Sequence, residues 1–312
     1  MFLLLLATVA AQEAGHYSPD SVAGKSATFV RFAEALGPKG EALDQQMAVA
    51  GSSIHELDLG VDLLGERAPE DLRAWRLAQR KAYAQQGLQA RAFSDWIQDA
   101  SGQVFGSALD IAVEEYGAPL EVCAARSGMA AIAMGPMAGG GGSCPGQDLS
   151  AQLAESMDAN AELTAVVDEL LAESWPTVKL DEAQQAAVPF AGEDGYVRLA
   201  VLAEALMGAR IEALEEGLDR DLSSLDRALA QGGAEAEDAL KEAEARRLRH
   251  EADLAKEGER LLGAIEKPLS KSGLSVALCA NPPAMGGCSG QDRTKEVVEA
   301  LRDDKKVKKA LE

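Results

Sequence analysis

Apolar residues recur every three or four positions over most of the chain, which is the spacing of one face of an α-helix. The clearest case is a row of leucines in the second half: Leu199, Leu202, Leu206, Leu214, Leu218, Leu222, Leu225 and Leu229. Two glycines at 232–233 end this row, because paired glycines favour a turn. A charged helix should follow from about Ala234 to Lys267-Pro268. The pattern therefore predicts a helical hairpin of the coiled-coil type.

The first half of the chain carries a similar pair of helical regions. One covers residues 20–65, with Gly37-Pro38 as a candidate interruption, and the other begins at Pro69 and runs towards Tyr116. Proline is well tolerated in the first turn of a helix. Helices of about 35 residues reach roughly 50 Å at 1.5 Å per residue, so we expect an elongated, hairpin-built molecule. No segment of the pattern requires a β-strand.

Two distant stretches repeat one motif, PMAGGGGSCPGQDLS at 136–150 and PAMGGCSGQDRT at 283–294. A constant offset of 144 aligns Cys288 with Cys144 and Asp292 with Asp148. Beyond the motif, apolar residues continue to meet apolar residues at helical spacing. Local composition alone would not keep that alignment, so we interpret it as an internal duplication.

Weaker matches extend the duplication upstream. LEVCA at 120–124 resembles VALCA at 276–280, and both place an aliphatic run before Cys-Ala. FVRFAEAL at 29–36 resembles YVRLAVLAEAL at 196–206 with a gap of three residues.

The duplication predicts an all-α fold of two tandem copies. Each copy is a long helical hairpin, followed by a disulfide-bounded loop and an amphipathic helix. The boundary should fall near Trp175-Pro176, because proline disfavours helix at the residue before it. The expected domains are a signal peptide at 1–11 and two repeat units at 12–176 and 177–312.

Composition agrees with this fold and narrows the range of partners. Of 312 residues, 47% are hydrophobic and only 4% are aromatic, a balance that favours helices over sheets. The formal net charge of −21 repels phosphate backbones and anionic lipid headgroups. We therefore expect no nucleic-acid partner.

The first residues form a candidate export signal. Phe2 to Ala11 is an apolar run that ends in small residues, and it is shorter than the roughly 20 residues that span a bilayer. It fits a secretory signal cut after Ala11, although it lacks a leading Lys or Arg, and a buried first helix is the alternative. No later segment has the length and apolarity of a membrane span. We expect a secreted or periplasmic protein without a stable membrane span.

Four cysteines, Cys123, Cys144, Cys279 and Cys288, fit an oxidising compartment. The repeat favours the pairs Cys123–Cys144 and Cys279–Cys288, each stabilising the fold by about 2–3 kcal/mol, while pairing between the copies stays open. None lies in a Cys-x-x-Cys arrangement, so we expect no thioredoxin-like site.

The aspartates of the repeated motif have a structural interpretation. Asp148 and Asp292 each precede an amphipathic helix and are candidate N-caps worth about 1 kcal/mol, with Ser150 and Thr294 as rival caps. The glycines before the second cysteine allow the chain to turn tightly.

The loop between the first two cysteines carries Met129, Met134 and Met137. Flexible thioether side chains adapt to varied surfaces, so this loop is a candidate docking site for a protein partner. Packing of these methionines on the repeat's own helices is the alternative. Thioethers can also hold Cu(I), but no histidine or further methionine cluster lies close enough to support such a site.

No catalytic or metal-binding constellation is recognisable. Gly24-Lys25-Ser26 resembles the end of a phosphate-binding loop, but Pro19 stands where that loop needs glycine. His16, His55 and His250 are too far apart in sequence for a helical zinc pair, so core or surface roles are expected for them. The chain also lacks the Gly-x-Ser-x-Gly turn of the hydrolases. We expect no enzyme activity, no cofactor and no metal.

These observations predict a secreted or periplasmic, non-enzymatic helical protein that acts as an interaction or cell-envelope structural module with a protein partner. The alternative is a carrier of an apolar small molecule or lipid between the hairpins, where helical bundles bind such ligands. Periodicity alone does not distinguish a filled core from a ligand groove.

Overall fold

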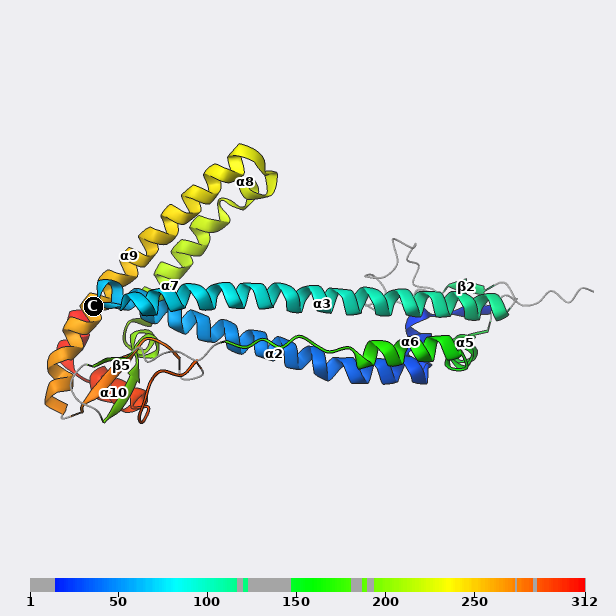
Figure 1. Cartoon of the computed structure of the whole chain (residues 1–312), viewed down its shortest axis with the longest axis horizontal. Coiled ribbons are helices and arrows are strands. Elements are labelled where there is room, and N and C mark those ends of the chain that lie inside the picture. Colours follow the sequence, from blue (N-terminus) through cyan, green and yellow to red (C-terminus); the bar gives the residue numbers. More distant parts are fainter. Residues whose placement is uncertain are drawn as a thin grey trace, which may run out of the picture. The chain divides into compact units, whose positions relative to one another are not determined.

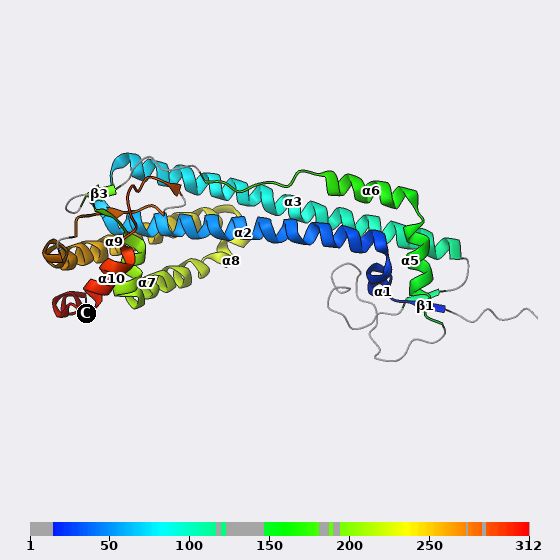
Figure 2. The same cartoon turned by 90° about the horizontal axis from the view of Figure 1, so that it is seen from below.

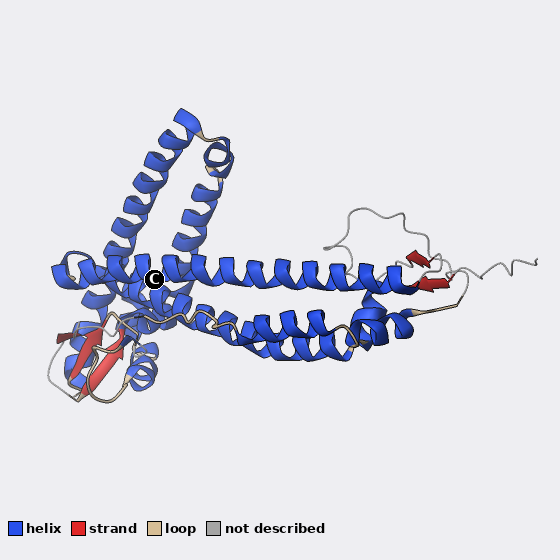
Figure 3. Cartoon of the chain, turned by 45° about the vertical axis from the view of Figure 1, so that its right-hand side comes forward, coloured by secondary structure: helices blue, strands red, loops and turns tan. Residues whose placement is uncertain are grey.

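The computed structural model describes residues 15–116, 120–122, 147–180, 187–189, 194–272, 274–282 and 285–311 (Figure 1). This part of the chain is all-α, as predicted, with long helices and strands of only three or four residues (Figure 3). The chain divides into two compact units, one from residues 1–45 and 88–177 and the other from 46–87 and 178–312.

The first unit is built from elements of the first copy. They are β1 (Gly15–Tyr17), α1 (Pro19–Lys25), the start of α2 (Ala27–Leu64), the end of α3 (Glu70–Tyr116), β2 (Leu120–Val122), α5 (Ser150–Asp158) and α6 (Ala161–Ala172). Helix α1 begins at Pro19, where the missing N–H costs nothing, and the Ser18 hydroxyl accepts a bond of 3.4 Å from the N–H of Ser21. Strands β1 and β2 pair in parallel, with Gly15 opposite Leu120.

The core of the first unit is formed by the apolar faces of its helices. Its buried side chains include Val22, Phe32, Ile97, Leu109, Leu153, Met157, Leu163 and Val167. Helices α5 and α6 supply four of them at helical spacing, which is the amphipathic pattern expected after the motif. Figure 2 shows α5 turning away from α6 at the short link between them.

The second unit combines the second copy with the closed end of the α2–α3 hairpin. Its elements are the end of α2, η1 (Gly65–Arg67), the start of α3, β3 (Ala187–Pro189), β4 (Gly195–Arg198), α7 (Leu199–Ser223), α8 (Asp226–Gln231), α9 (Gly233–Ser272), β5 (Val276–Cys279), α10 (Thr294–Arg302) and α11 (Lys305–Leu311). In its small sheet β5 is central, antiparallel to β3 and parallel to β4.

The core of the second unit holds side chains from both halves of the sequence. The largest fully buried ones are Leu57, Leu63, Leu199, Leu202, Leu261, Ile265, Leu269, Leu278, Met285 and Leu301. Two glycines permit this close packing. A Cβ at Gly258 on α9 would lie 1.8 Å from the carbonyl oxygen of Leu63, and one at Gly60 on α2 would lie 2.2 Å from that of Ala280.

Two predicted helix breaks are wrong. Pro38 lies inside the continuous helix α2, and the break falls earlier, at Ser26. Pro268 also lies inside a helix, because α9 continues to Ser272. Proline fixes φ near its helical value, so a helix can pass through it at the loss of one hydrogen bond.

The sequence pattern also missed the strands. Each has three or four residues, which is too short for alternation to be visible, and its partner lies about 80 or more residues away in sequence. The strands correct one upstream match: YVR at 196–198 lies in β4, whereas FVRF at 29–32 lies in helix α2. The structural counterpart of β4 is β1, whose Gly-His-Tyr begins like the Gly-Tyr-Val of β4.

Candidate functional site

The first repeated motif fixes the start of α5 to strand β1. The N–H of His16 donates to the carbonyl of Gln147 at 2.9 Å, and the N–H of Leu149 donates to the carbonyl of His16 at 2.9 Å. Asp148 Oδ1 accepts bonds from the N–H of Ser150 at 2.9 Å and from its hydroxyl at 2.6 Å. The Ser150 hydroxyl in turn accepts from the N–H of Ser18 at 3.1 Å. We call this set the first clamp.

The second copy builds the same set of bonds, the second clamp. The N–H of Tyr196 donates to the carbonyl of Gln291 at 3.0 Å, and the carbonyl of Tyr196 accepts from the N–H of Arg293 at 2.9 Å. Asp292 Oδ1 accepts from the N–H of Thr294 at 2.9 Å and from its hydroxyl at 2.5 Å. The Thr294 hydroxyl accepts from the N–H of Arg198 at 2.9 Å. The residues that recur in the motif therefore make the same hydrogen bonds in both copies.

The clamps locate the two predicted capping aspartates. Helices α5 and α10 begin at Ser150 and Thr294, so the residues at the cap positions are Leu149 and Arg293, whose side chains make no capping bond. The aspartates stand one residue earlier, and each accepts a hydrogen bond from the first N–H of its helix. Bonds from the hydroxyl and N–H of Ser150 hold the pKa of Asp148 below its ordinary value.

Glycines make the second clamp sterically feasible. Gly195 has φ +150° and Gly290 has φ +97°, and a Cβ at Gly195 would lie 2.2 Å from the carbonyl oxygen of Gln291. Only glycine allows β4 to approach the motif this closely.

Next to this clamp, Cys279 and Cys288 form a disulfide, with Cα atoms 6.1 Å apart. Cys279 is the last residue of β5, and it is buried with its sulfur 3.5 Å from the side-chain oxygen of Asn281. The amide of Asn281 donates to the carbonyl of Gly286, which holds the loop between the cysteines. The other predicted site residues, Cys123, Cys144, Met129, Met134 and Met137, lie outside the described residues.

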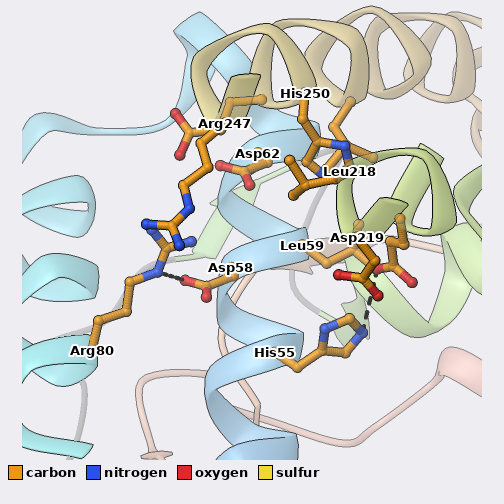
Figure 4. A pocket seen from close by; sticks show the side chains of 12 residues that line it. His55, Asp58, Leu59, Asp62, Arg80, Leu218, Asp219, Arg247 and His250 are labelled. Atoms are coloured by element: carbon orange, nitrogen blue, oxygen red, sulfur yellow. Dashed lines mark hydrogen bonds and ion pairs between the residues drawn. The ribbon is translucent and has the colours of Figure 1, made fainter. Parts of the chain in front are cut away.

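A polar cleft of about 500 Å³ lies in the second unit, where α2, α3, α7 and α9 meet (Figure 4). We call it the polar cleft. Its lining residues are His55, Asp58, Leu59, Asp62, Arg80, Glu215, Leu218, Asp219, Arg247, His250, Glu251 and Leu254. The two histidines, 195 positions apart in sequence, are brought to one cleft, which no spacing rule could indicate.

Ion pairs occupy the α2–α3 side of the polar cleft. Arg80 Nε lies 2.6 Å from Asp58 Oδ1, and Arg76 forms a buried ion pair with Asp62. Glu251 of α9 lies 3.9 Å from Arg76. Burial raises the pKa of Asp62 to about 6 against the opposing charge of Arg76, and burial also raises the pKa of Asp58.

His55 of α2 is directed towards α7, where its Nε2 lies 3.6 Å from Glu215 (Figure 4). The same atom lies 3.9 Å from Glu204, which is also on α7. These pairs connect the closed end of the first hairpin to the second copy. Among the described residues, no group of three or more His, Cys, Asp or Glu side chains is arranged to hold a metal ion. The geometry of the polar cleft is that of a charged junction between helices.

None of the helices described is both long and apolar enough to cross a membrane. No protein-family model matches the chain, and no significant match was found among curated proteins or solved structures.

Proposed function

We propose that this protein is a non-enzymatic interaction module that acts in an oxidising compartment, secreted or periplasmic, and presents a helical hairpin to a protein partner. The observation that carries this proposal is a row of leucines on α7 and α8 that the protein's own helices cover only in part. The row consists of Leu214, Leu218, Leu222, Leu225 and Leu229.

The leucine row lies on the outer part of the α7–α9 hairpin, residues 212–238, which we call the distal arm (Figure 1). None of its residues is fully buried, and Leu229 is 37% exposed. On the facing helix α9, Ala239 and Ala243 are the buried residues next to the arm. Burial of a fully exposed leucine is worth about 1.5–3 kcal/mol, and a partner helix that covers the part of each leucine still exposed would gain a fraction of that per residue.

The tip of the distal arm is held in place, which favours recognition. The guanidinium of Arg246 donates to the carbonyl of Asp221 and, at 2.8 Å, to the hydroxyl of Ser224. Its Nε also donates to Glu242 one turn earlier, at 2.9 Å. These bonds tie α7 to α9 beside the leucine row, and pre-organisation of this kind lowers the entropic cost of binding.

Two features support the compartment. The Cys279–Cys288 disulfide favours an oxidising environment, and the apolar run at residues 2–11 fits an export signal. A fusion of residues 1–20 to alkaline phosphatase without its own signal tests the second feature directly. Phosphatase activity outside the cytoplasm is expected, and enzyme that stays inside and inactive would contradict export.

Site-specific photo-crosslinking in the native host tests the partner. A benzophenone amino acid at Leu225, the residue before α8, should give one defined protein adduct, and the same group at Arg227, two positions later, should give none. The Leu222→Glu change should remove the Leu225 adduct while leaving helix content unchanged. An equal adduct pattern at both positions, or no adduct at either, would argue against the proposal.

The carrier alternative predicts a different result in the same preparation. Native mass spectrometry of the protein from its host should then show an extractable apolar molecule, whose occupancy does not depend on Leu222. The interaction proposal expects no uncharged apolar ligand between the hairpins.

A further inference from the structure

Both copies bend shortly after the strand of the clamp. In the first copy, α1 ends at Lys25, Ser26 is extended (φ −70°, ψ 117°), and α2 begins at Ala27. In the second copy, the bend lies inside α7 at Met207 (φ −134°, ψ 19°). Counted from β1 and β4, the two bends coincide to within one residue.

In the first copy a carboxylate closes the bend. Asp158, the last residue of α5, accepts from the Ser26 hydroxyl at 2.6 Å, the N–H of Ala27 at 2.8 Å and the N–H of Thr28 at 3.0 Å. Partial burial would raise the pKa of Asp158, but these bonds outweigh it and lower the pKa, so the carboxylate is held in its charged form.

In the second copy the carboxylate is replaced by a cation. Helices α5 and α10 both have nine residues, and the next caps also match, since Asn160 and Asp304 each accept two N–H bonds. The residue equivalent to Asp158 is therefore Arg302. Leu206 and Met207 stand at the bend, where the first copy has a hydroxyl.

A cleft of about 610 Å³ lies at this second bend, and we call it the bend cleft. This volume is within the range of small-molecule sites. Its apolar lining includes Leu206, the buried side chains of Met207 and Leu301, and, from α11, those of Val307 and Leu311.

Two cations line the bend cleft and remain available to a ligand. Arg302 and Lys308 are exposed, and their side chains make no hydrogen bond or ion pair with another residue in the described ranges. Residues 302–309 hold five basic residues against two acidic ones, in a chain of net charge −21. Apolar walls beside two unpaired cations match a ligand with an anionic head and an apolar body.

We propose that the bend cleft binds an amphiphile with a carboxylate head and an apolar tail. The carboxylate pairs with Arg302 and Lys308 and takes the position that the Asp158 side chain occupies in the first copy. The tail lies along the half-buried Leu206, beside the buried side chains of Met207, Leu301 and Val307. This site is separate from the leucine row and does not depend on the protein-partner proposal.

Calorimetric titration of the full chain with decanoate, below its micelle concentration, tests the proposal. One decanoate per chain is expected, with affinity that weakens as salt is raised. Decanol lacks the charge and acetate lacks the tail, so each should bind at least about tenfold more weakly, as expected for loss of one charged or apolar contact set. Equal binding of decanol and decanoate would overturn the assignment of the head group.

Substitutions test whether decanoate binds in the bend cleft. Arg302→Gln should lower decanoate affinity about tenfold. Lys305→Gln removes the same charge outside the cleft lining and should change the affinity by less than about twofold. Equal effects of the two changes would show a diffuse charge response and overturn the site. In protein with ¹³C-labelled methionine methyls, only the signal assigned by Met207→Leu should shift with decanoate in a saturable manner.

The first copy supplies a further test. The double change Leu206→Ser with Arg302→Asp rebuilds the Ser26–Asp158 arrangement at the second bend. It should abolish decanoate binding, whereas retained binding would contradict the proposal. A helical peptide of residues 161–173, which carries four acidic residues, serves as the protein-like competitor. Binding of this peptide without binding of decanoate would assign the cleft to a protein partner and overturn the small-molecule proposal.

Discussion

Asp292 binds Thr294 twice through one carboxylate oxygen, which accepts both the N–H at 2.9 Å and the hydroxyl at 2.5 Å. Asp148 and Ser150 repeat this geometry at 2.9 and 2.6 Å. The pairing orients each hydroxyl so that its oxygen accepts an N–H at the end of the clamp strand, from Ser18 directly after β1 and from Arg198, the last residue of β4. One short motif therefore connects a helix start to a strand that lies nearly 100 or more residues away.

Loss of this carboxylate should weaken the second unit. We expect Asp292→Ala to lower the free energy of unfolding by about 1–2 kcal/mol, because the first N–H of α10 loses its acceptor and Thr294 loses its orientation. Urea denaturation followed by circular dichroism measures the change. Asp303→Ala, at an exposed position after the same helix, should cost less than about 0.5 kcal/mol. Equal effects of the two changes would show that the clamp contributes nothing specific.

The buried pair of Asp62 and Arg76 should make stability depend on pH. The pKa of Asp62 is about 6 in the folded chain and 3.8 for an ordinary aspartate, so between these values the folded state binds more protons. Stability should therefore fall as pH rises from about 4 to 6 and level off above, by about 3 kcal/mol from this group.

Asp62→Asn should remove this part of the pH dependence, and the comparison uses slopes of unfolding free energy against pH. Glu237→Gln, at an exposed position of α9, is the matched control and should leave the slope unchanged. An identical slope in the wild type and Asp62→Asn would refute the assignment.

The Cys279–Cys288 disulfide should stabilise the folded chain through its small loop. The two cysteines are nine positions apart, for which loop entropy gives about 2.5 kcal/mol. Under oxidising conditions, the variant with Cys279→Ser and Cys288→Ser should be less stable than the wild type by this amount. Its free energy of unfolding should equal that of wild type in which the 279–288 disulfide is reduced. Peptide mapping without reduction should recover the 279–288 pair. Recovery of either cysteine as a free thiol from the native compartment would refute it.

Two glycines of α9 should respond in opposite directions to alanine. Gly258→Ala would place a Cβ 1.8 Å from the Leu63 carbonyl oxygen, so α9 must shift, and we expect a loss of about 3 kcal/mol or more. Gly263 has open space at the same atom, and Gly263→Ala should gain about 0.5–1 kcal/mol from helix propensity. Thermal unfolding of the two variants measures both. A similar midpoint for the two would contradict the close contact of α9 with α2.

The helices and the repeat could be predicted because their signals are local. The leucine row and the motif around Asp148 and Asp292 recur at fixed spacings, and the structure places both aspartates at equivalent clamps. Helix ends at prolines were predicted less well, because a proline weakens a helix without having to end it. No pattern of neighbouring residues in the sequence indicates the strands or the polar cleft. His55 of α2 and His250 of α9 line the same cleft only because the fold brings these two helices together.

The sequence by itself determined that the chain is all-α, acidic and duplicated, since periodicity, composition and a repeated motif are properties of neighbouring residues. Tertiary structure decided that the two copies differ at the bend, with Asp158 closing one and Arg302 facing a cleft at the other. That difference depends on which side chain a helix end brings to a bend more than 90 residues away in sequence. Such contacts follow from packing in space, which the order of residues does not display.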